Sequence, residues 1–197
     1  MIFEKDYFKD SVLSNYRDYR KKKYDALFED LLRLGIVQGD SIVEFGCATG
    51  ALIYEFVNHG YTNIVGTDVS WWAITYGRNE LGIPDTKLQY LNYNLLASLS
   101  DWLLCLDVLE HIGTDELKHI IDIMCARQLI LRVPVCAREG QDFVLDVSKN
   151  DKTHIQCHTK LWWKELLSRR YTFDRPIAGN AIYDSEGVFA GVFNVIS

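Results

Sequence analysis

The sequence predicts an α/β fold built on a mostly parallel sheet with helices on both faces. From Ser41 onward, short apolar, β-branched runs alternate with helical patterns, which is the arrangement of consecutive βαβ units. Right-handed crossovers between such strands place helices on both faces of the sheet. The chain has 197 residues, of which 48% are hydrophobic and 24% charged, and it contains no linker or internal repeat. We therefore expect a single domain over residues 1–197.

The strands and helices of this sheet follow in order along the chain. We expect strands at about 41–46, 63–68, 87–92, 102–107 and 128–133. Helices are expected at about 50–59, 71–81 and 114–126. The last of these begins with Thr114-Asp115-Glu116-Leu117, in which Thr114 is the expected cap.

The two ends of the chain add further elements. The opening segment from Tyr7 to Leu34 has helical periodicity and ends at Gly35 and Gly39, so we expect residues 1–38 to form a helical segment that covers the site. The residues expected on its buried face are Tyr24, Leu27, Phe28, Leu31 and Leu32. A helix is expected at 161–170, and the tail at 172–197 is expected to form two strands joined by a turn at 184–187.

Composition and charge exclude several classes of protein. A formal net charge of −6 argues against a nucleic-acid partner, and a solvated helix face accounts for the basic cluster from Arg17 to Lys23. Apolar runs are far shorter than the roughly 20 residues that cross a bilayer. The N-terminus does not resemble a secretory signal, and the five cysteines form no Cys-x-x-Cys pair. We expect a cytoplasmic protein with reduced thiols, no nucleic-acid partner and no membrane span.

The first predicted strand runs into a glycine turn, Gly46-Cys47-Ala48-Thr49-Gly50, and then into a helix. Such a turn exposes backbone N–H groups to a ligand and is typical of nucleotide sites. The Gly-x-x-x-Gly spacing differs from the Gly-x-Gly-x-x-Gly of dinucleotide loops, which argues against a nicotinamide oxidoreductase. Glu44 would repel a pyrophosphate but favours a ligand that carries an ammonium and a sulfonium. S-adenosylmethionine is such a ligand.

Asp68 ends the second predicted strand, where a carboxylate can accept hydrogen bonds from both ribose hydroxyls of a nucleoside. The alternative is that Asp68 only caps the following helix through Val69 and Ser70. We favour the ribose interpretation because the glycine turn precedes it.

Three stretches, 43–50, 65–70 and 105–112, resemble the successive motifs of class I S-adenosylmethionine-dependent methyltransferases in order and spacing. The resemblance implies a Rossmann-like, seven-stranded, doubly wound sheet with an antiparallel final strand. It also places Asn94, where many relatives have aspartate, beside the adenine, and Ala48 stands where many relatives have glycine. The expected cofactor-binding residues are Glu44, Gly46, Cys47, Ala48, Gly50, Asp68, Val69, Asn94, Leu95 and Leu106.

Methyl transfer is an in-line displacement, so a catalytic base is useful but not required. Asp107, Glu110 and His111 follow the fourth strand, at the edge where such sheets bind ligands. His111 is a candidate base. The Leu-Glu-His motif also occurs in methyltransferases with very different acceptors, which suggests instead that it shapes the site.

The segment 135–160 lacks periodicity and is long for a connection, so we expect it to be an active-site loop that closes as a lid with Tyr16 and Tyr19. Its Asp151-Lys152-Thr153-His154, followed by Trp162-Trp163, resembles a segment of methyltransferases that accompany glycosyltransferases in surface-polysaccharide pathways. His154 is the preferred acid or base, oriented by Asp151; alternatively, it holds the loop in shape.

The expected function is methyl transfer to a small-molecule acceptor, a hydroxyl of a sugar or glycan precursor being the candidate. The alternative is an inactive S-adenosylmethionine-binding module that acts as a partner or sensor. No metal site is expected, because a zinc cluster of Asp151, His154, Cys157 and His158 would lack a second ligand pair at a recognised spacing. The tryptophan pairs 71–72 and 162–163 are expected to pack in the core.

Overall fold

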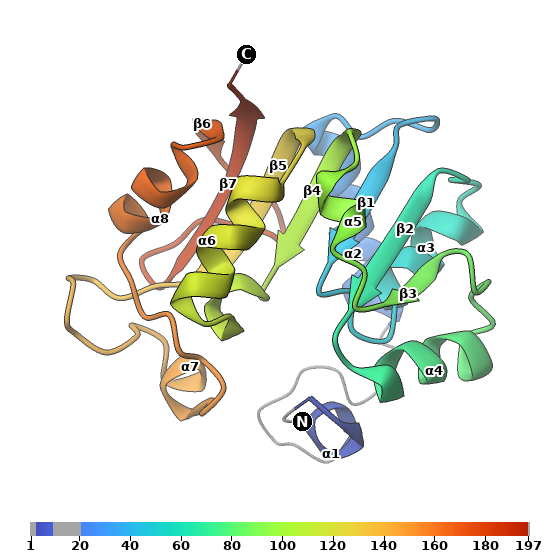
Figure 1. The fold of residues 1–197 in the computed structure, drawn as a ribbon, viewed down its shortest axis with the longest axis horizontal. Coiled ribbons are helices and arrows are strands. Elements are labelled where there is room, and N and C mark those ends of the chain that lie inside the picture. The colour runs from blue at the N-terminus through green and yellow to red at the C-terminus, as the bar shows by residue number, and fades with distance from the viewer. Residues whose placement is uncertain (1–2, 10–20, 197) are drawn as a thin grey trace.

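The fold is a seven-stranded sheet in the order β3-β2-β1-β4-β5-β7-β6, seen in a computed structural model that describes residues 3–9 and 21–196 (Figure 1). All strands run parallel except β7, which pairs antiparallel with both β5 and β6. The strands are β1 (Ile42–Phe45), β2 (Ile64–Asp68), β3 (Leu88–Tyr90), β4 (Ser100–Leu106), β5 (Ala126–Pro134), β6 (Tyr171–Pro176) and β7 (Val188–Val195). The predicted α/β class, with its Rossmann-like sheet and antiparallel final strand, is confirmed.

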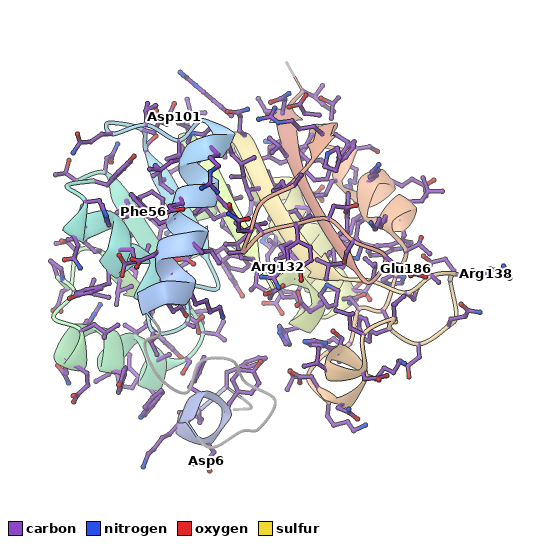
Figure 2. All side chains as sticks on the ribbon, turned by 180° about the vertical axis from the view of Figure 1, so that it is seen from behind. Asp6, Phe56, Asp101, Arg132, Arg138 and Glu186 are labelled. Atoms are coloured by element: carbon purple, nitrogen blue, oxygen red, sulfur yellow. The ribbon has the colours of Figure 1, made fainter. Side chains whose placement is uncertain are left out.

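Neighbouring residues of each strand point to opposite faces, which divides the core into two layers. On one face Ile42 and Leu104 pack with α2 (Lys21–Leu34), α3 (Ala51–Asn58) and α4 (Trp71–Glu80). Figure 2 views the molecule from this side, with α2 crossing in front of the sheet. On the other face Val43 and Leu103 pack with α5 (Asn94–Ala97), α6 (Thr114–Ile123) and α8 (Lys160–Leu167).

Three short elements lie at the edge of the sheet where the parallel strands end. Figure 1 shows α1 (Lys5–Lys9) and α7 (Asp146–Asn150) beyond this edge. A 3₁₀ turn, η1 (Leu109–His111), follows β4 there. This carboxyl edge is where parallel sheets of this kind bind ligands.

Some predicted details of the helices are wrong. Leu32 is 38% exposed and does not share the buried face of α2. Thr114 is not the cap of α6: Gly113 occupies that position, and the Thr114 hydroxyl instead accepts a hydrogen bond from Gln156 at 3.2 Å. The segment 135–160 contains α7, which its sequence did not predict. Tyr16, Tyr19 and the start of the basic cluster lie outside the described residues.

The tryptophan pairs divide unequally between core and surface. Trp163 is fully buried and Trp162 half-buried, as predicted. Trp71 is 56% exposed, so the prediction that it packs in the core is wrong. Trp72 is half-buried and stacks on Phe8 of α1 at 5.8 Å between ring centroids.

All five cysteines are free thiols, as expected. Among residues 3–9 and 21–196, no helix combines the length and the apolar character needed to cross a membrane.

Candidate active site

The predicted cofactor loop connects β1 to α3 at the carboxyl edge. Gly46, Ala48 and Gly50 all have left-handed backbones, with φ of 76°, 50° and 76°. A side chain at Gly46 would also clash, because its Cβ would lie 2.3 Å from a methyl group of Val108. Glycine is therefore required at position 46 both by conformation and by space.

The loop's amide groups are largely used inside the protein, contrary to the predicted exposed N–H groups. Gly46 and Cys47 donate to the Thr67 carbonyl at 2.9 and 3.1 Å, and Gly50 donates to the Cys47 carbonyl at 2.8 Å. The loop thus offers few free donors to a phosphate. This arrangement suits a ligand without a pyrophosphate.

Asp68 connects the loop to the start of α4. One carboxylate oxygen accepts the Ala48 amide and the other the Ser70 amide, each at 2.8 Å. Burial raises the pKa of Asp68 in spite of these bonds. Because each oxygen has a second lone pair, the carboxylate can both fix the loop and accept hydroxyl groups of a ligand.

Glu44 lies beneath the loop with 7% of its surface exposed, and its Oε2 accepts no hydrogen bond from the described residues. Burial, followed by the neighbouring Asp68, raises its pKa well above the ordinary value. Cys47 is also buried, and its sulfur packs so closely on Gly66 that a Cβ there would lie 2.8 Å away.

Helix α4 supports the same loop through Gly77. A Cβ at this position would lie 2.2 Å from the Thr49 carbonyl oxygen and 2.7 Å from Leu88. The backbone of the cofactor loop therefore occupies the space that a side chain at position 77 would need. Only glycine permits so close an approach of helix and loop.

We expect Gly77→Ala to destabilise the protein by about 2 kcal/mol or more, since overpacking against a backbone group exceeds the gain of about 1 kcal/mol in helix propensity. Thermal unfolding followed by circular dichroism should show a melting temperature several degrees lower. Gly113→Ala is the control, because a Cβ there meets nothing within 4 Å. Equal melting temperatures for the two variants would contradict the tight contact.

A cavity of about 220 Å³ opens beside this loop at the carboxyl edge. Five of the predicted site residues line it, namely Gly46, Asp68, Val69, Asp107 and His111. Its remaining wall was not predicted: Phe3, Tyr7, Phe8, Phe45, Tyr93, Val108, Ile112 and Glu116. Tyr7 and Phe8 belong to α1 and Phe3 directly precedes it, so this N-terminal segment covers the cavity.

Other predicted cofactor residues lie away from the cavity wall. Asn94 is exposed, and the adjacent Tyr93 lines the cavity in its place. Leu95 and Leu106 are half-buried and pack against the two core layers. The sequence shows a polar residue, Asn94, after the third strand. Whether Asn94 or its neighbour Tyr93 faces the cavity depends on the short helix α5, which local sequence does not predict.

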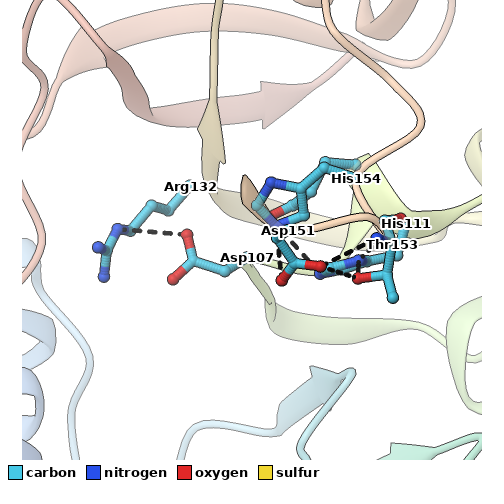
Figure 3. Close-up of polar contacts among 7 residues, drawn as sticks. Asp107, His111, Arg132, Asp151, Thr153 and His154 are labelled. Atoms are coloured by element: carbon cyan, nitrogen blue, oxygen red, sulfur yellow. Dashed lines mark hydrogen bonds and ion pairs between the residues drawn. The ribbon is translucent and has the colours of Figure 1, made fainter. Parts of the chain in front are cut away.

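Of the predicted catalytic residues, Asp107 and His111 lie on the wall and His154 lies behind them. Asp107 has a left-handed backbone, with φ of 54°, and its carboxylate is 3.4 Å from the Arg132 guanidinium. The rings of His111 and His154 are 4.7 Å apart between centroids. Figure 3 shows Asp107 turned toward Arg132, with Asp151 near His154 and Thr153 beside His111.

The segment 151–154 is held by its own hydrogen bonds. Asp151 accepts the Thr153 amide at 2.9 Å and the Thr153 hydroxyl at 2.6 Å. His154 Nε2 lies 3.5 Å from Asp151 Oδ2, the juxtaposition expected from the sequence. Burial alone would raise the pKa of Asp151, but the bonds from Thr153 hold it below the ordinary value.

Both histidines are neutral at neutral pH. Burial, with a contribution from His154, lowers the pKa of His111 to about 4. Burial also lowers the pKa of His154, although Asp151 opposes the shift. Each ring therefore keeps one nitrogen with a free lone pair.

The zinc cluster that we considered from the sequence is not assembled. His158 lies 3.0 Å from Glu139 and stacks on Trp162, and the Cys157 sulfur is 3.4 Å from the Gln141 carbonyl. Only His154 and Asp151 of that set are neighbours.

No known family model matches the sequence, and no curated protein matches it. Solved structures do share its fold. One is magnesium protoporphyrin IX methyltransferase from Synechocystis with bound S-adenosylhomocysteine, with 20% identity, 92% of this chain and 85% of that chain covered, and a TM-score of 0.61. Another is the N-methyltransferase NodS from Bradyrhizobium japonicum in complex with S-adenosylhomocysteine, with 17% identity, 91% and 88% covered, and a TM-score of 0.60. A TehB-like S-adenosylmethionine-dependent methyltransferase from Corynebacterium glutamicum has 12% identity, 88% of each chain covered, and a TM-score of 0.61.

At these identities the likeness establishes the fold. The chain has the fold of S-adenosylmethionine-dependent methyltransferases over about nine tenths of its length.

Proposed function

We propose that this protein is an S-adenosylmethionine-dependent methyltransferase that acts on a small-molecule acceptor. The observation that carries the proposal is a single cavity lined both by the cofactor loops, through Gly46, Asp68 and Val69, and by the polar residues Asp107 and His111. A methyltransferase needs its donor and acceptor sites to meet in this way, because the nucleophile must approach the methyl carbon in line.

The loop favours S-adenosylmethionine over a dinucleotide. Its amides at Gly46, Cys47 and Gly50 are occupied within the protein, so a pyrophosphate would find few donors. The Asp68 carboxylate lines the cavity and favours an ammonium and a sulfonium. The structures of similar fold that hold S-adenosylmethionine or S-adenosylhomocysteine support the same choice.

For the acceptor we propose a hydroxyl group of a sugar or glycan precursor. The cavity wall joins the carboxylates of Asp107 and Glu116 to the rings of Tyr7 and Tyr93. Carboxylates accept hydrogen bonds from sugar hydroxyls, while aromatic rings pack on the apolar faces of a sugar. The same aromatic wall excludes water from the methyl group.

Calorimetry tests the cofactor directly. We expect S-adenosylmethionine and S-adenosylhomocysteine to bind, and NAD not to bind. Asp68→Ala should weaken binding by about 1.5 to 3 kcal/mol, the range for hydrogen bonds to a charged group. Asp101→Ala is the matched control. Asp101 also accepts a backbone amide, that of Ser41 at 2.9 Å, but it lies at the start of β4, away from the cavity.

Tight NAD binding without any S-adenosyl ligand would overturn the proposal. An unchanged affinity in folded Asp68→Ala would leave Asp68 as a structural bond between Ala48 and Ser70. Cofactor binding without transfer to any hydroxylated acceptor would favour an inactive binding module.

A further inference from the structure

Glu110 is a buried carboxylate that receives no hydrogen bond from the residues the structure describes. It belongs to η1, directly after β4, and is 0% exposed. Within residues 3–9 and 21–196, neither of its carboxylate oxygens accepts a hydrogen bond from another residue. Its Oε1 instead lies 3.9 Å from His111 Nε2 and 4.0 Å from His154 Nε2. These distances are too long for hydrogen bonds, and a buried charge without compensation is costly.

The hydrogen bonds of His111 direct its free lone pair toward Glu110. Its Nδ1 lies 3.2 Å from the Thr153 carbonyl oxygen, so this nitrogen carries the proton. The Thr153 hydroxyl, 2.9 Å from the same Nδ1, donates its own proton to Asp151. Nε2 is therefore unprotonated and faces a carboxylate oxygen. His111 Nε2 and Glu110 Oε1 are two electron-rich atoms that face each other in a buried place, and a cation between them would be stabilised by both.

The surrounding charges point the same way. Three carboxylates gather here, those of Asp107, Glu110 and Asp151, and Asp151 has a side-chain exposure of only 10%. Arg132 forms an ion pair with Asp107 at 3.4 Å. Burial, followed by Asp107, raises the pKa of Glu110 well above its ordinary value.

We propose that Glu110, His111 and His154 bind a divalent transition-metal ion such as Mn²⁺, Fe²⁺ or Zn²⁺. One ligand atom from each of the three residues lies within 4.8 Å of the other two. Ligands of a tetrahedral site with bonds of about 2.1 Å stand about 3.4 Å apart. Small side-chain rotations would close the difference. Two imidazoles and one carboxylate form a ligand set that these ions accept.

Thr153 and Asp151 are the supporting residues of this site. A metal-binding histidine usually donates its other ring N–H to a carbonyl or carboxylate, which fixes the ring and its tautomer. The Thr153 carbonyl does this for His111 (Figure 3). Asp151 in turn fixes Thr153, and its Oδ2 lies 3.5 Å from His154 Nε2, the nitrogen that also faces Glu110.

The position of the ion gives it a role, which rests on the proposed function. His111 and Asp107 line the cavity, so an ion on His111 Nε2 would reach an acceptor bound there. A hydroxyl that coordinated such an ion would have a lowered pKa and would release its proton to bulk water. Its oxygen would then form the new C–O bond with the methyl carbon while the C–S bond breaks. The electron pair of that bond passes to sulfur, giving S-adenosylhomocysteine.

Metal binding can be measured without cofactor or acceptor. Protein treated with a chelator is titrated with Mn²⁺, and free Mn²⁺ is followed by electron paramagnetic resonance. Mn²⁺ is the probe because five free thiols would capture Zn²⁺. We expect one ion per chain with a micromolar dissociation constant. Glu110→Gln and His154→Gln should each weaken it tenfold or more, and Thr153→Val should weaken it to a smaller extent.

Glu55→Gln is the matched control. Like Glu110, Glu55 is buried, at 1% exposed, and lies 3.9 Å from a histidine, His59. Unlike Glu110, it does not belong to the group of possible metal ligands found among the described residues. It should bind Mn²⁺ as the unmodified chain does. Absence of a bound ion would overturn the proposed site. So would Glu110→Gln and His154→Gln variants that bind Mn²⁺ as tightly as the unmodified chain. If one variant fails to fold by circular dichroism, the other decides. Calorimetry with S-adenosylmethionine on the same samples separates loss of the metal site from failure of the proposed function.

Discussion

Replacing His111 by glutamine is expected to lower the rate of methyl transfer about a hundredfold or more, the lower range for loss of a group that acts on the reacting proton. His111 lines the cavity opposite the cofactor loop and is half-buried, so its loss changes the acceptor side of the site. Cofactor affinity should stay unchanged, because Asp68 and the loop at 46–50 have no hydrogen bond to this ring. The measurement is kcat with saturating acceptor, together with calorimetry of S-adenosylmethionine.

His119→Gln provides the control, since His119 is an exposed histidine of α6. It should keep both kcat and cofactor affinity. Near-normal turnover in His111→Gln would mean that the ring only fills space. A fall in both kcat and cofactor affinity would mean that it shapes the whole cavity.

Trp163→Ala should destabilise the protein by about 3 to 5 kcal/mol, the usual cost of removing a fully buried large aromatic side chain. Trp163 is 0% exposed and packs with Leu167 and Tyr171 between α8 and the sheet. Trp162→Ala should cost clearly less, because Trp162 is half-buried and stacks mainly on His158. Denaturant unfolding followed by tryptophan fluorescence and circular dichroism gives both values. Equal losses in the two variants would contradict this account.

The fold was predictable because each strand carries its own signal. Strands β1, β2, β4 and β5 are mostly buried and appear as apolar runs, and the turn residues at 184–187 indicated the antiparallel pair. Helix boundaries were less predictable. Thr114 has the sequence of a cap, yet the preceding Gly113 takes that position and Gln156 binds the threonine hydroxyl. That bond comes from a residue 42 positions away, which local patterns do not contain.

The site was predictable only where its residues follow strand ends. Asp68 and Asp107 were found this way, and both line the cavity. The meeting of Glu110 with His154 was not predictable, because it depends on how residues 135–160 fold back over η1. The backbone amides of Ile155 and Gln156 both donate to the Glu110 carbonyl, at 2.9 and 3.0 Å, and bring the segment into place. From the sequence, Glu110 and His154 were therefore not brought together, and no metal site was expected.

The cover of the cavity by α1 has a consequence for how ligands come and go. Phe8 of α1 packs with Ala48 and Ala73 in a small apolar cluster separate from the two main core layers. A five-residue helix whose buried contacts, among the described residues, centre on this small cluster is expected to open with less free energy than global unfolding requires. Ligand exchange can then proceed by release of α1 alone while the sheet stays intact. The residence time of a bound molecule would be governed by how firmly Phe8 sits on Trp72, so substitutions in the cover would change dissociation rates more than the chemistry beneath it.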